Sequence, residues 1–260
     1  MVRQIGGSPL SKPLTILSCA FFALTAFAGS QVHAKDRPLG VVELFTSQGC
    51  NSCPPADRVL GELAQDDDVI ALAYHVDYWD YLGWRDTLGS AENTERQRDY
   101  GRSFGSGSVY TPQAVINGRT HVNGANKNAV HRTVERMADT ADGMVVDVSI
   151  RQSGDSIVIE AGDSKGAPRK AHLVLVYFDP VRNVAIERGE NRGKTITYWN
   201  AVSSIQAAGM WHGKASRYEL PLSEVTKKGA GGCAVLLQAS GKNGLPGPVL
   251  GAAIMTQPSG

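Results

Sequence analysis

The chain has 260 residues, of which 42% are hydrophobic and 20% are charged. This is the balance of an ordinary globular protein with enough apolar material for a core, and it excludes a collagen-like, coiled-coil or largely disordered chain. The 26 lysines and arginines nearly balance the 25 aspartates and glutamates, so the net charge of +1 gives no reason to expect nucleic acid or an anionic membrane as a partner.

Residues 1–34 have the features of a secretory signal peptide. Arg3 and Lys12 precede an uncharged apolar run, and Ala34 supplies a small residue at a cleavage position. The apolar run is shorter than the ~20 residues needed to span a bilayer core. Cleavage would also remove Cys19 and would leave more acidic than basic residues. We therefore expect a periplasmic or secreted protein with no membrane span after cleavage, and the alternative is an uncleaved N-terminal anchor.

The first elements of the mature chain predict a βαβ unit. Residues 41–45 are β-branched and aromatic, which is typical of a short strand. A helix is predicted over residues 54–64, because prolines suit its first turn and its apolar residues share one face. Residues 69–76 are nearly continuously apolar, as in a parallel strand that is buried on both faces.

The following segment ends in a predicted hairpin and a last helix. Ser90 is a suitable N-cap for a polar helix, and Asn117-Gly118 is the strongest two-residue hairpin signal. In chain order we expect an aromatic loop at residues 77–86, a helix at 91–98, strands at 113–116 and 119–122, and a helix at 125–138.

From residue 144 the sequence changes to short alternating segments separated by Gly, Asp, Asn and Ser, which indicate a β-sandwich or barrel-like domain. The expected strands include residues 144–150, 156–161, 171–178, 195–198 and 233–238. The predicted organisation is a signal peptide at residues 1–34, an α/β domain at 35–140 and a β-rich, sandwich-like domain at 141–260.

Cys50-Asn51-Ser52-Cys53 is a C-x-x-C motif between the first predicted strand and helix. Thiol–disulfide exchange needs a thiolate, which the free backbone N–H groups and dipole of a helix start favour. We expect Cys50 to face solvent and attack, and Cys53, one turn further on, to resolve the mixed disulfide. A structural disulfide and a metal site remain as alternatives, although no second C-x-x-C or closely spaced His pair is present.

The order of elements over about residues 39–140 resembles the thioredoxin fold. Residues 111–118 are similar to the segment around the cis-proline of thioredoxins and glutaredoxins. The resemblance implies that Pro112 is cis and lies beside the cysteine pair, with Thr111 able to pair with a substrate strand. Glu43 resembles the buried acid of that fold, although the loop between it and Cys50 is one residue longer here.

Two departures from that pattern bear on the chemistry. Asn51-Ser52 replaces the Gly-Pro or Pro-His dipeptides of well-known members, so the direction of electron flow stays open. Asn123-Gly124 matches only in part the glycine pair that helps glutaredoxins hold glutathione.

The whole chain resembles more closely the DUF1223 family of exported bacterial proteins, which is classed as thioredoxin-like. The matching segments are ELFTSQGC at residues 43–50, HVDYWD at 75–80 and YTPQ at 110–113. This resemblance implies a fold and export, and it implies no particular reaction.

Other candidate residues have a structural and a functional interpretation. Glu43 is either a salt-bridged structural acid or a proton acceptor for Cys53. His75 and Asp77 end a strand, where α/β sites collect, but both can simply cap loops.

Three aromatic residues follow in the loop, Trp79, Tyr81 and Trp84. Packing is their favoured role, and an apolar lip for a substrate is the alternative. Cys233 lies in an apolar strand and is expected to be a buried thiol. Residues 187–193 read as a solvated turn from which Arg188 or Arg192 could reach Cys50.

These observations favour an exported, thioredoxin-like thiol–disulfide oxidoreductase that uses no organic cofactor and no metal. We expect its partner to be an exported protein or a small-molecule thiol or disulfide. The alternatives are a non-catalytic binding scaffold with a structural disulfide and a periplasmic handler of soft metals. The expected site consists of catalytic Cys50, Cys53 and Pro112 with possible support from Glu43, Thr111, His75 and Asp77.

Overall fold

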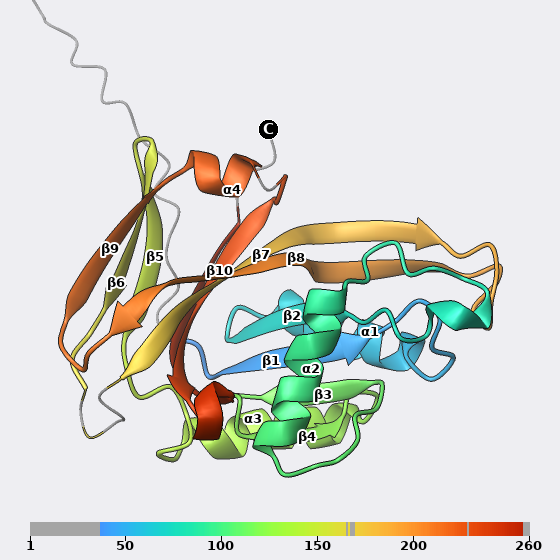
Figure 1. Cartoon of the computed structure of the whole chain (residues 1–260), viewed down its shortest axis with the longest axis horizontal. Helices are drawn as coiled ribbons and strands as arrows, with labels where there is room; N and C mark the ends of the chain where they lie inside the picture. The colour runs from blue at the N-terminus through green and yellow to red at the C-terminus, as the bar shows by residue number, and fades with distance from the viewer. Residues whose placement is uncertain (1–36, 165, 167–169, 228, 257–260) are drawn as a thin grey trace, which may run out of the picture. The chain divides into compact units, whose positions relative to one another are not determined.

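The structure is a computed structural model that describes residues 37–164, 166, 170–227 and 229–256. The predicted signal peptide lies outside these residues. The described part is a mixed α/β fold that consists mostly of strands, and it has one eight-stranded and one three-stranded sheet (Figure 1). None of the helices in this part is long and apolar enough to cross a membrane.

The large sheet has the strand order β11-β10-β7-β8-β2-β1-β3-β4. Strand β1 runs parallel to β2 and antiparallel to β3, and β2 joins β8 in parallel through Ala73 and Ala201. Strands from both sides of the predicted boundary near residue 140 therefore share one sheet. Its strands are β1 (Gly40–Thr46), β2 (Val69–His75), β3 (Gln113–Ile116), β4 (Thr120–Asn123), β7 (Ala171–Ala185), β8 (Thr195–Trp211), β10 (Gly232–Ser240) and β11 (Pro246–Thr256).

Helices cover both faces of the β1–β4 part of this sheet. Because side chains alternate along a strand, Val42 and Leu44 of β1 pack with α1 (Pro54–Ala64) and α3 (Lys127–Ala138). Phe45 packs on the opposite face with Tyr100 of α2 (Ala91–Ser103). The cysteine pair precedes α1, so the fold places it at the end of the sheet where β1 stops.

The second sheet consists of β5 (Val148–Ser153), β6 (Ser156–Ala161) and β9 (Ser216–Pro221). A buried apolar cluster joins Ile150 and Ile157 of this sheet to Leu173 of β7 and Val235 of β10. The short elements are α4 (Ser223–Lys227) and the 3₁₀ turns η1 (Asp80–Leu82) and η2 (Lys242–Gly244).

Several predicted elements are confirmed near their expected bounds. Ser90 caps α2, since its side chain accepts a hydrogen bond from the N–H of Asn93 at 3.1 Å. The Asn117-Gly118 turn joins β3 to β4, and both residues have the positive φ of 51° and 62° that such a turn requires.

The long β7–β8 hairpin differs from the two short strands predicted there. Strand β8 continues well past residue 198, through a mixture of small, polar and apolar residues whose exposure does not alternate. Pairing with β7 along almost its whole length holds this segment extended. Strands β9 and β11 were not predicted either, because their patterns are too polar or too rich in glycine.

Candidate functional site

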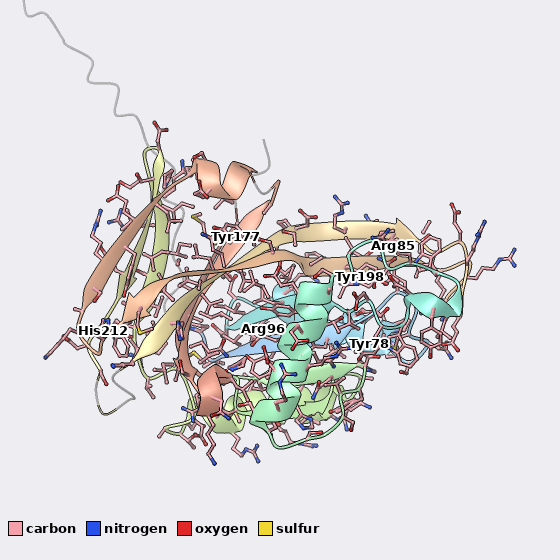
Figure 2. The ribbon with its side chains drawn as sticks, viewed as in Figure 1. Tyr78, Arg85, Arg96, Tyr177, Tyr198 and His212 are labelled. Carbon is pink, nitrogen blue, oxygen red and sulfur yellow. A yellow bond between two sulfur atoms is a disulfide. The ribbon has the colours of Figure 1, made fainter. Side chains whose placement is uncertain are left out.

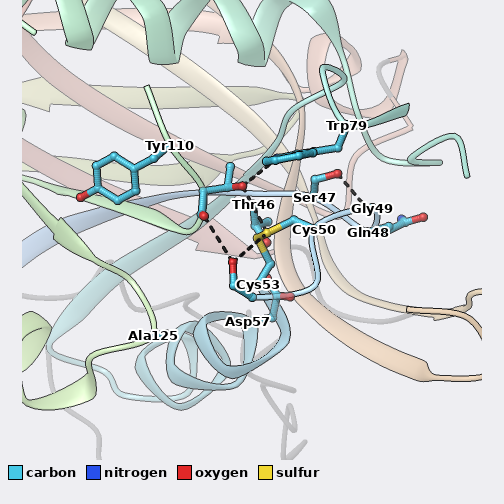
Figure 3. The surroundings of a disulfide bond; sticks show 12 residues. Thr46, Ser47, Gln48, Gly49, Cys50, Cys53, Asp57, Trp79, Tyr110 and Ala125 are labelled. Atoms are coloured by element: carbon cyan, nitrogen blue, oxygen red, sulfur yellow. Dashed lines mark hydrogen bonds between the residues drawn. A yellow bond between two sulfur atoms is a disulfide. The ribbon is translucent and has the colours of Figure 1, made fainter. Parts of the chain in front are cut away.

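A disulfide joins Cys50 and Cys53 immediately before α1, with 5.4 Å between their Cα atoms (Figure 3). Cys53 is the N-cap residue of the helix, and Pro54 and Pro55 occupy its first positions. The motif thus has the placement between strand and helix that the sequence predicts.

The start of α1 does not offer the free N–H groups that we expected for a Cys50 thiolate. Pro54 and Pro55 carry no N–H, and the N–H groups of Ala56 and Asp57 donate to the carbonyl oxygen of Cys53 at 2.8 and 3.1 Å. The pair of prolines is the physical reason for this correction. The dipole of the helix remains, but direct donors to the sulfur must come from side chains.

A hydroxyl from another loop provides such a donor. The Oγ1 of Thr111 donates to the Sγ of Cys50 at 3.2 Å, and the Oγ of Ser52 lies 3.4 Å from the same sulfur (Figure 3). The indole Nε1 of Trp79 donates to the Thr111 hydroxyl at 2.8 Å. Residues far apart in sequence therefore converge on one sulfur atom.

The peptide bond between Thr111 and Pro112 is cis, as the resemblance implied. The carbonyl of Pro112 accepts a hydrogen bond from the N–H of Gly124 at 3.0 Å, and the carbonyl of Thr111 accepts one from the Ser52 hydroxyl at 3.5 Å. The predicted proximity of this segment to the cysteine motif is thus observed.

Cys50 does not face solvent, contrary to our expectation. It is 3% exposed, and Cys53 is fully buried. The connection between β7 and β8 lies against the motif, and the side-chain amide of Asn191 donates to the carbonyl oxygens of Gln48 and Cys50 at 2.9 Å each. Asn191 is fully buried, whereas Arg188 and Arg192 on the same connection are exposed.

His75 belongs to a buried ion pair behind the motif. Its Nδ1 lies 2.8 Å from the Oδ2 of Asp86, which also accepts the N–H of Gln48 at 2.7 Å. Burial by itself lowers the pKa of His75, but the charges of Asp86 and Asp57 outweigh it and the pKa is raised. Burial by itself would raise the pKa of Asp86, but the charge of His75 and the hydrogen bonds lower it.

Asp57 is a buried acid on the first turns of α1. Its Oδ1 accepts a hydrogen bond from the Thr46 hydroxyl at 2.6 Å, while its Oδ2 has no partner in the described structure. Burial, assisted by the charge of Asp86, raises the pKa of Asp57 to about 7, against the opposing effects of Thr46, His75 and Arg58. This carboxyl therefore titrates in the physiological range.

Glu43 lies in a different network under α2. One carboxylate oxygen accepts the Nε of Arg96 at 2.6 Å, and the other accepts the hydroxyl of Tyr100. Arg96 also donates to the Oε1 of Gln238 at 3.2 Å (Figure 2 labels Arg96 on α2). The described contacts of Glu43 are those of a structural acid, and none of them involves a cysteine.

The remaining candidates mostly hold loops together. The carboxylate of Asp77 accepts the hydroxyl of Thr94 on α2 at 2.6 Å. Trp84 donates to the side-chain oxygen of Gln48 at 2.8 Å, and Tyr81 is 76% exposed. Cys233 is a buried free thiol, as predicted. Among the described residues no group of three or more His, Cys, Asp or Glu side chains could hold a metal ion.

Sequence reasoning missed Asp57, Asp86 and Asn191. Asp57 carries a readable signal, because it is an acid four residues after Cys53 on the helix side that is otherwise apolar. Asp86 and Asn191 carry no such signal, since each acts through contacts with residues far away in sequence.

The comparisons with known proteins place the chain in a family. A family described as protein of unknown function (DUF1223) matches residues 41–238, and the chain belongs to this family. A crystal structure of an Agrobacterium tumefaciens protein, a structural genomics target, is 44% identical with a TM-score of 0.79, covering 86% of this chain and 96% of that one.

A more distant solved structure is HBP35 of Porphyromonas gingivalis. It is 10% identical with a TM-score of 0.58, covering 85% of this chain and 76% of that one, so its likeness concerns the fold alone. No curated protein matches the chain.

Proposed function

We propose that the protein is a thioredoxin-like thiol–disulfide oxidoreductase that acts through Cys50 and Cys53 in an exported, oxidising compartment. Support for the thioredoxin-like assignment comes from the β2-β1-β3-β4 part of the sheet, with α1 and α3 on one face and α2 on the other. The disulfide itself suits an oxidising compartment. The partner would be an exported protein or a small-molecule thiol or disulfide.

The observation that carries this proposal is the hydrogen bond from Thr111 to Cys50. A hydroxyl held at 3.2 Å from a sulfur stabilises negative charge there, and a group fixed in advance costs no reorganisation when the thiolate forms. The disulfide also closes a loop of only four residues, which contributes about 2 kcal/mol in the chain-entropy account and less than a long loop would. Stability alone is a weak reason for it.

The exchange cycle follows from the different surroundings of the two sulfurs. Starting from the disulfide, a partner thiolate attacks the Sγ of Cys50, the bond to Cys53 breaks, and Cys53 leaves. A second partner thiolate then releases Cys50, so the partner dithiol is oxidised and the pair is reduced. Because Cys50 is buried, the residues that shield its sulfur from solvent must move before a partner can reach it.

The experiment is the alkylation of reduced protein by iodoacetamide over a range of pH, with Cys50→Ser and Cys53→Ser variants. Rapid alkylation at neutral pH that is confined to Cys50 supports exchange chemistry. Partners trapped as mixed disulfides on the Cys53→Ser variant, and absent from a Cys50→Ser control, would identify the substrate class.

A non-catalytic scaffold is the second candidate, and the 3% exposure of Cys50 is the observation that favours it. In that case reduced Cys50 would react no faster than an ordinary buried thiol, and dithiothreitol would reduce the disulfide only when the protein unfolds.

A further inference from the structure

Three buried polar atoms near the cysteine motif have no hydrogen-bond partner in the described structure. They are the Oδ2 of Asp57 on α1, the Nε2 of His75 on β2 and the hydroxyl of Tyr198 on β8. The rings of His75 and Tyr198 meet edge to face with centroids 4.5 Å apart. Buried polar groups are nearly always paired, so unpartnered ones drawn from neighbouring elements call for a functional explanation.

Asp57 is the one of the three that follows Cys53 by a single helical turn. Its N–H donates to the carbonyl oxygen of Cys53 at 3.1 Å. Asp57 is one of the residues that surround the disulfide (Figure 3). Thr46 occupies one carboxyl oxygen and leaves the other free. The Oδ2 atom can therefore carry a proton without breaking the hydrogen bond from Thr46, next to the more deeply buried cysteine.

The fully buried position of Cys53 creates a need for such a group. When the disulfide is opened at Cys50, Cys53 leaves as a thiolate in a site that is closed to solvent. An unpaired charge is poorly tolerated there, so a proton must arrive from a neighbouring side chain.

A cleft open to solvent borders Asp57, whose carboxyl is itself buried. The cleft has a volume of about 640 Å³ and lies between α1 and the start of β8. Asp57 and Pro54 form part of its wall, together with Arg58, Lys194 and Trp199. Brief opening of this wall would let solvent in the cleft exchange a proton with the carboxyl.

The charges around Asp57 suit a group that gains and loses a proton near neutral pH. Those facing it come from several elements: His75 on β2, Asp86 in the following loop, and Arg58 on α1 itself. Burial is the largest influence, and with Asp86 it raises the pKa of Asp57 to about 7 against Thr46, His75 and Arg58. Efficient proton transfer requires a pKa near the working pH.

We propose that Asp57 donates the proton to Cys53 when the disulfide opens and accepts it when the disulfide forms, a role for which the sequence had suggested Glu43. In the opening step the partner's sulfur bonds to the Sγ of Cys50, the Cys50–Cys53 bond breaks, and its electron pair leaves with Cys53. The proton moves from the Asp57 carboxyl to that sulfur, and the carboxylate regains a proton from the cleft.

This inference rests on the proposed function, and one experiment separates the two. Reduced protein is mixed with excess 5,5′-dithiobis(2-nitrobenzoate), and release of thionitrobenzoate is followed in a stopped-flow spectrometer over a range of pH. The first phase is the attack of Cys50. The second is the attack of Cys53 on the mixed disulfide, which releases the second thionitrobenzoate.

In the wild type we expect the second phase to accelerate with a midpoint near pH 7. Asp57→Asn should slow it by about 100-fold at pH 7 and move its midpoint upward, with the first phase unchanged. Glu62→Gln is the matched control, because Glu62 is an exposed acid on the same helix and cleft, and it should change neither phase.

An unchanged second phase in Asp57→Asn would overturn the inference. A first phase as slow as that of an ordinary thiol would instead overturn the proposed function. If the Asn variant does not fold, the side-chain carboxyl resonance of Asp57 in oxidised wild type decides: titration near pH 7 is expected, and titration below pH 5 contradicts the role.

Discussion

The indole N–H of Trp79 donates a hydrogen bond to the hydroxyl oxygen of Thr111 over 2.8 Å. An oxygen that already accepts at one lone pair turns its own proton elsewhere, and here the proton points to the Sγ of Cys50 at 3.2 Å. The aromatic loop therefore acts on the cysteine pair through Thr111. Packing explains the position of this loop. The two hydrogen bonds from Trp79 to Thr111 and from Thr111 to Cys50, here called the relay, mean that Trp79 also affects the charge that Cys50 can carry.

The relay predicts the effect of Thr111→Val, which keeps the shape of the side chain and removes the donor. A hydrogen bond to a charged group contributes about 1.5–3 kcal/mol, so alkylation of reduced Cys50 at pH 7 should slow by about tenfold or more. Trp79→Phe should slow it less, because the hydroxyl remains but is free to rotate. Ser108→Ala is a control on the same loop, and equal rates in Thr111→Val and wild type would contradict the relay.

The buried pair of Glu43 and Arg96 predicts a loss of stability without a loss of thiol reactivity. Arg96→Leu leaves a carboxylate buried without its partner, and we expect a cost of about 3–5 kcal/mol in urea unfolding. Glu43→Gln should cost a similar amount, because its amide oxygen accepts from only one of the two donors, Arg96 and Tyr100, and its NH2 group faces the other. Neither variant should alter the pH profile of Cys53 attack in protein that remains folded, and an altered profile would restore Glu43 as a proton acceptor.

The ion pair of His75 and Asp86 predicts a stability contribution that depends on pH. The pKa of His75 is raised, so its contribution is complete below the unfolded pKa of about 6.5 and is lost as the pH rises through the folded value. The pKa of Asp86 is lowered, so its contribution is present above about pH 4 and is lost as the pH falls through the folded value.

Asp86→Asn should therefore destabilise the protein most near pH 5, by about 3–5 kcal/mol, and less at pH 8. Urea unfolding at the two pH values measures the difference, with Asp80→Asn, a neighbouring and more exposed acid, for comparison. An equal cost at pH 5 and pH 8 would show that the pair is not charged in the folded protein.

How much of this could be predicted from the sequence depends on the range of the interactions. The cysteine motif, the Asn117-Gly118 turn and the Ser90 cap are local signals, and each identifies its structure within a few residues. The cis bond before Pro112 came from a family resemblance. The family itself is confirmed over residues 41–238.

The errors about the exposure of Cys50 and the partner of Glu43 have one physical origin, which is that distant segments determine what surrounds a side chain. The C-x-x-C motif suggests an exposed Cys50, but Asn191 binds its carbonyl oxygen and Trp79 packs against the preceding Gly49, both from distant loops. An acid on a β-strand suggested a link to Cys53, yet Glu43 points to α2, where Arg96 compensates its charge. The alternation of side chains along a strand predicts that Glu43 is buried, but it does not predict which residue will be its partner.

Asn191 holds the β7–β8 connection against the cysteine motif, so its removal should make the disulfide easier to reach. Its side-chain NH2 group donates hydrogen bonds to the carbonyl oxygens of Gln48 and Cys50. Its side-chain oxygen accepts a hydrogen bond from the ammonium group of Lys194 at 2.8 Å. Asn191→Ala leaves the Gln48 carbonyl without its donor, at about 1–3 kcal/mol, whereas the Cys50 carbonyl keeps the N–H of Cys53. The connection should then open more often, and native protein should be reduced by dithiothreitol at least tenfold faster.

Arg192→Ala is the matched control, since it alters an exposed neighbour on the same connection and should leave the reduction rate unchanged. Rates are compared well below the unfolding midpoint of each variant, so that local opening and global unfolding are kept apart. If Asn191→Ala is reduced no faster than wild type, the connection does not control access to Cys50. The partner would then have to approach from the side of Thr111 and Ser52, whose hydroxyl groups contact the sulfur.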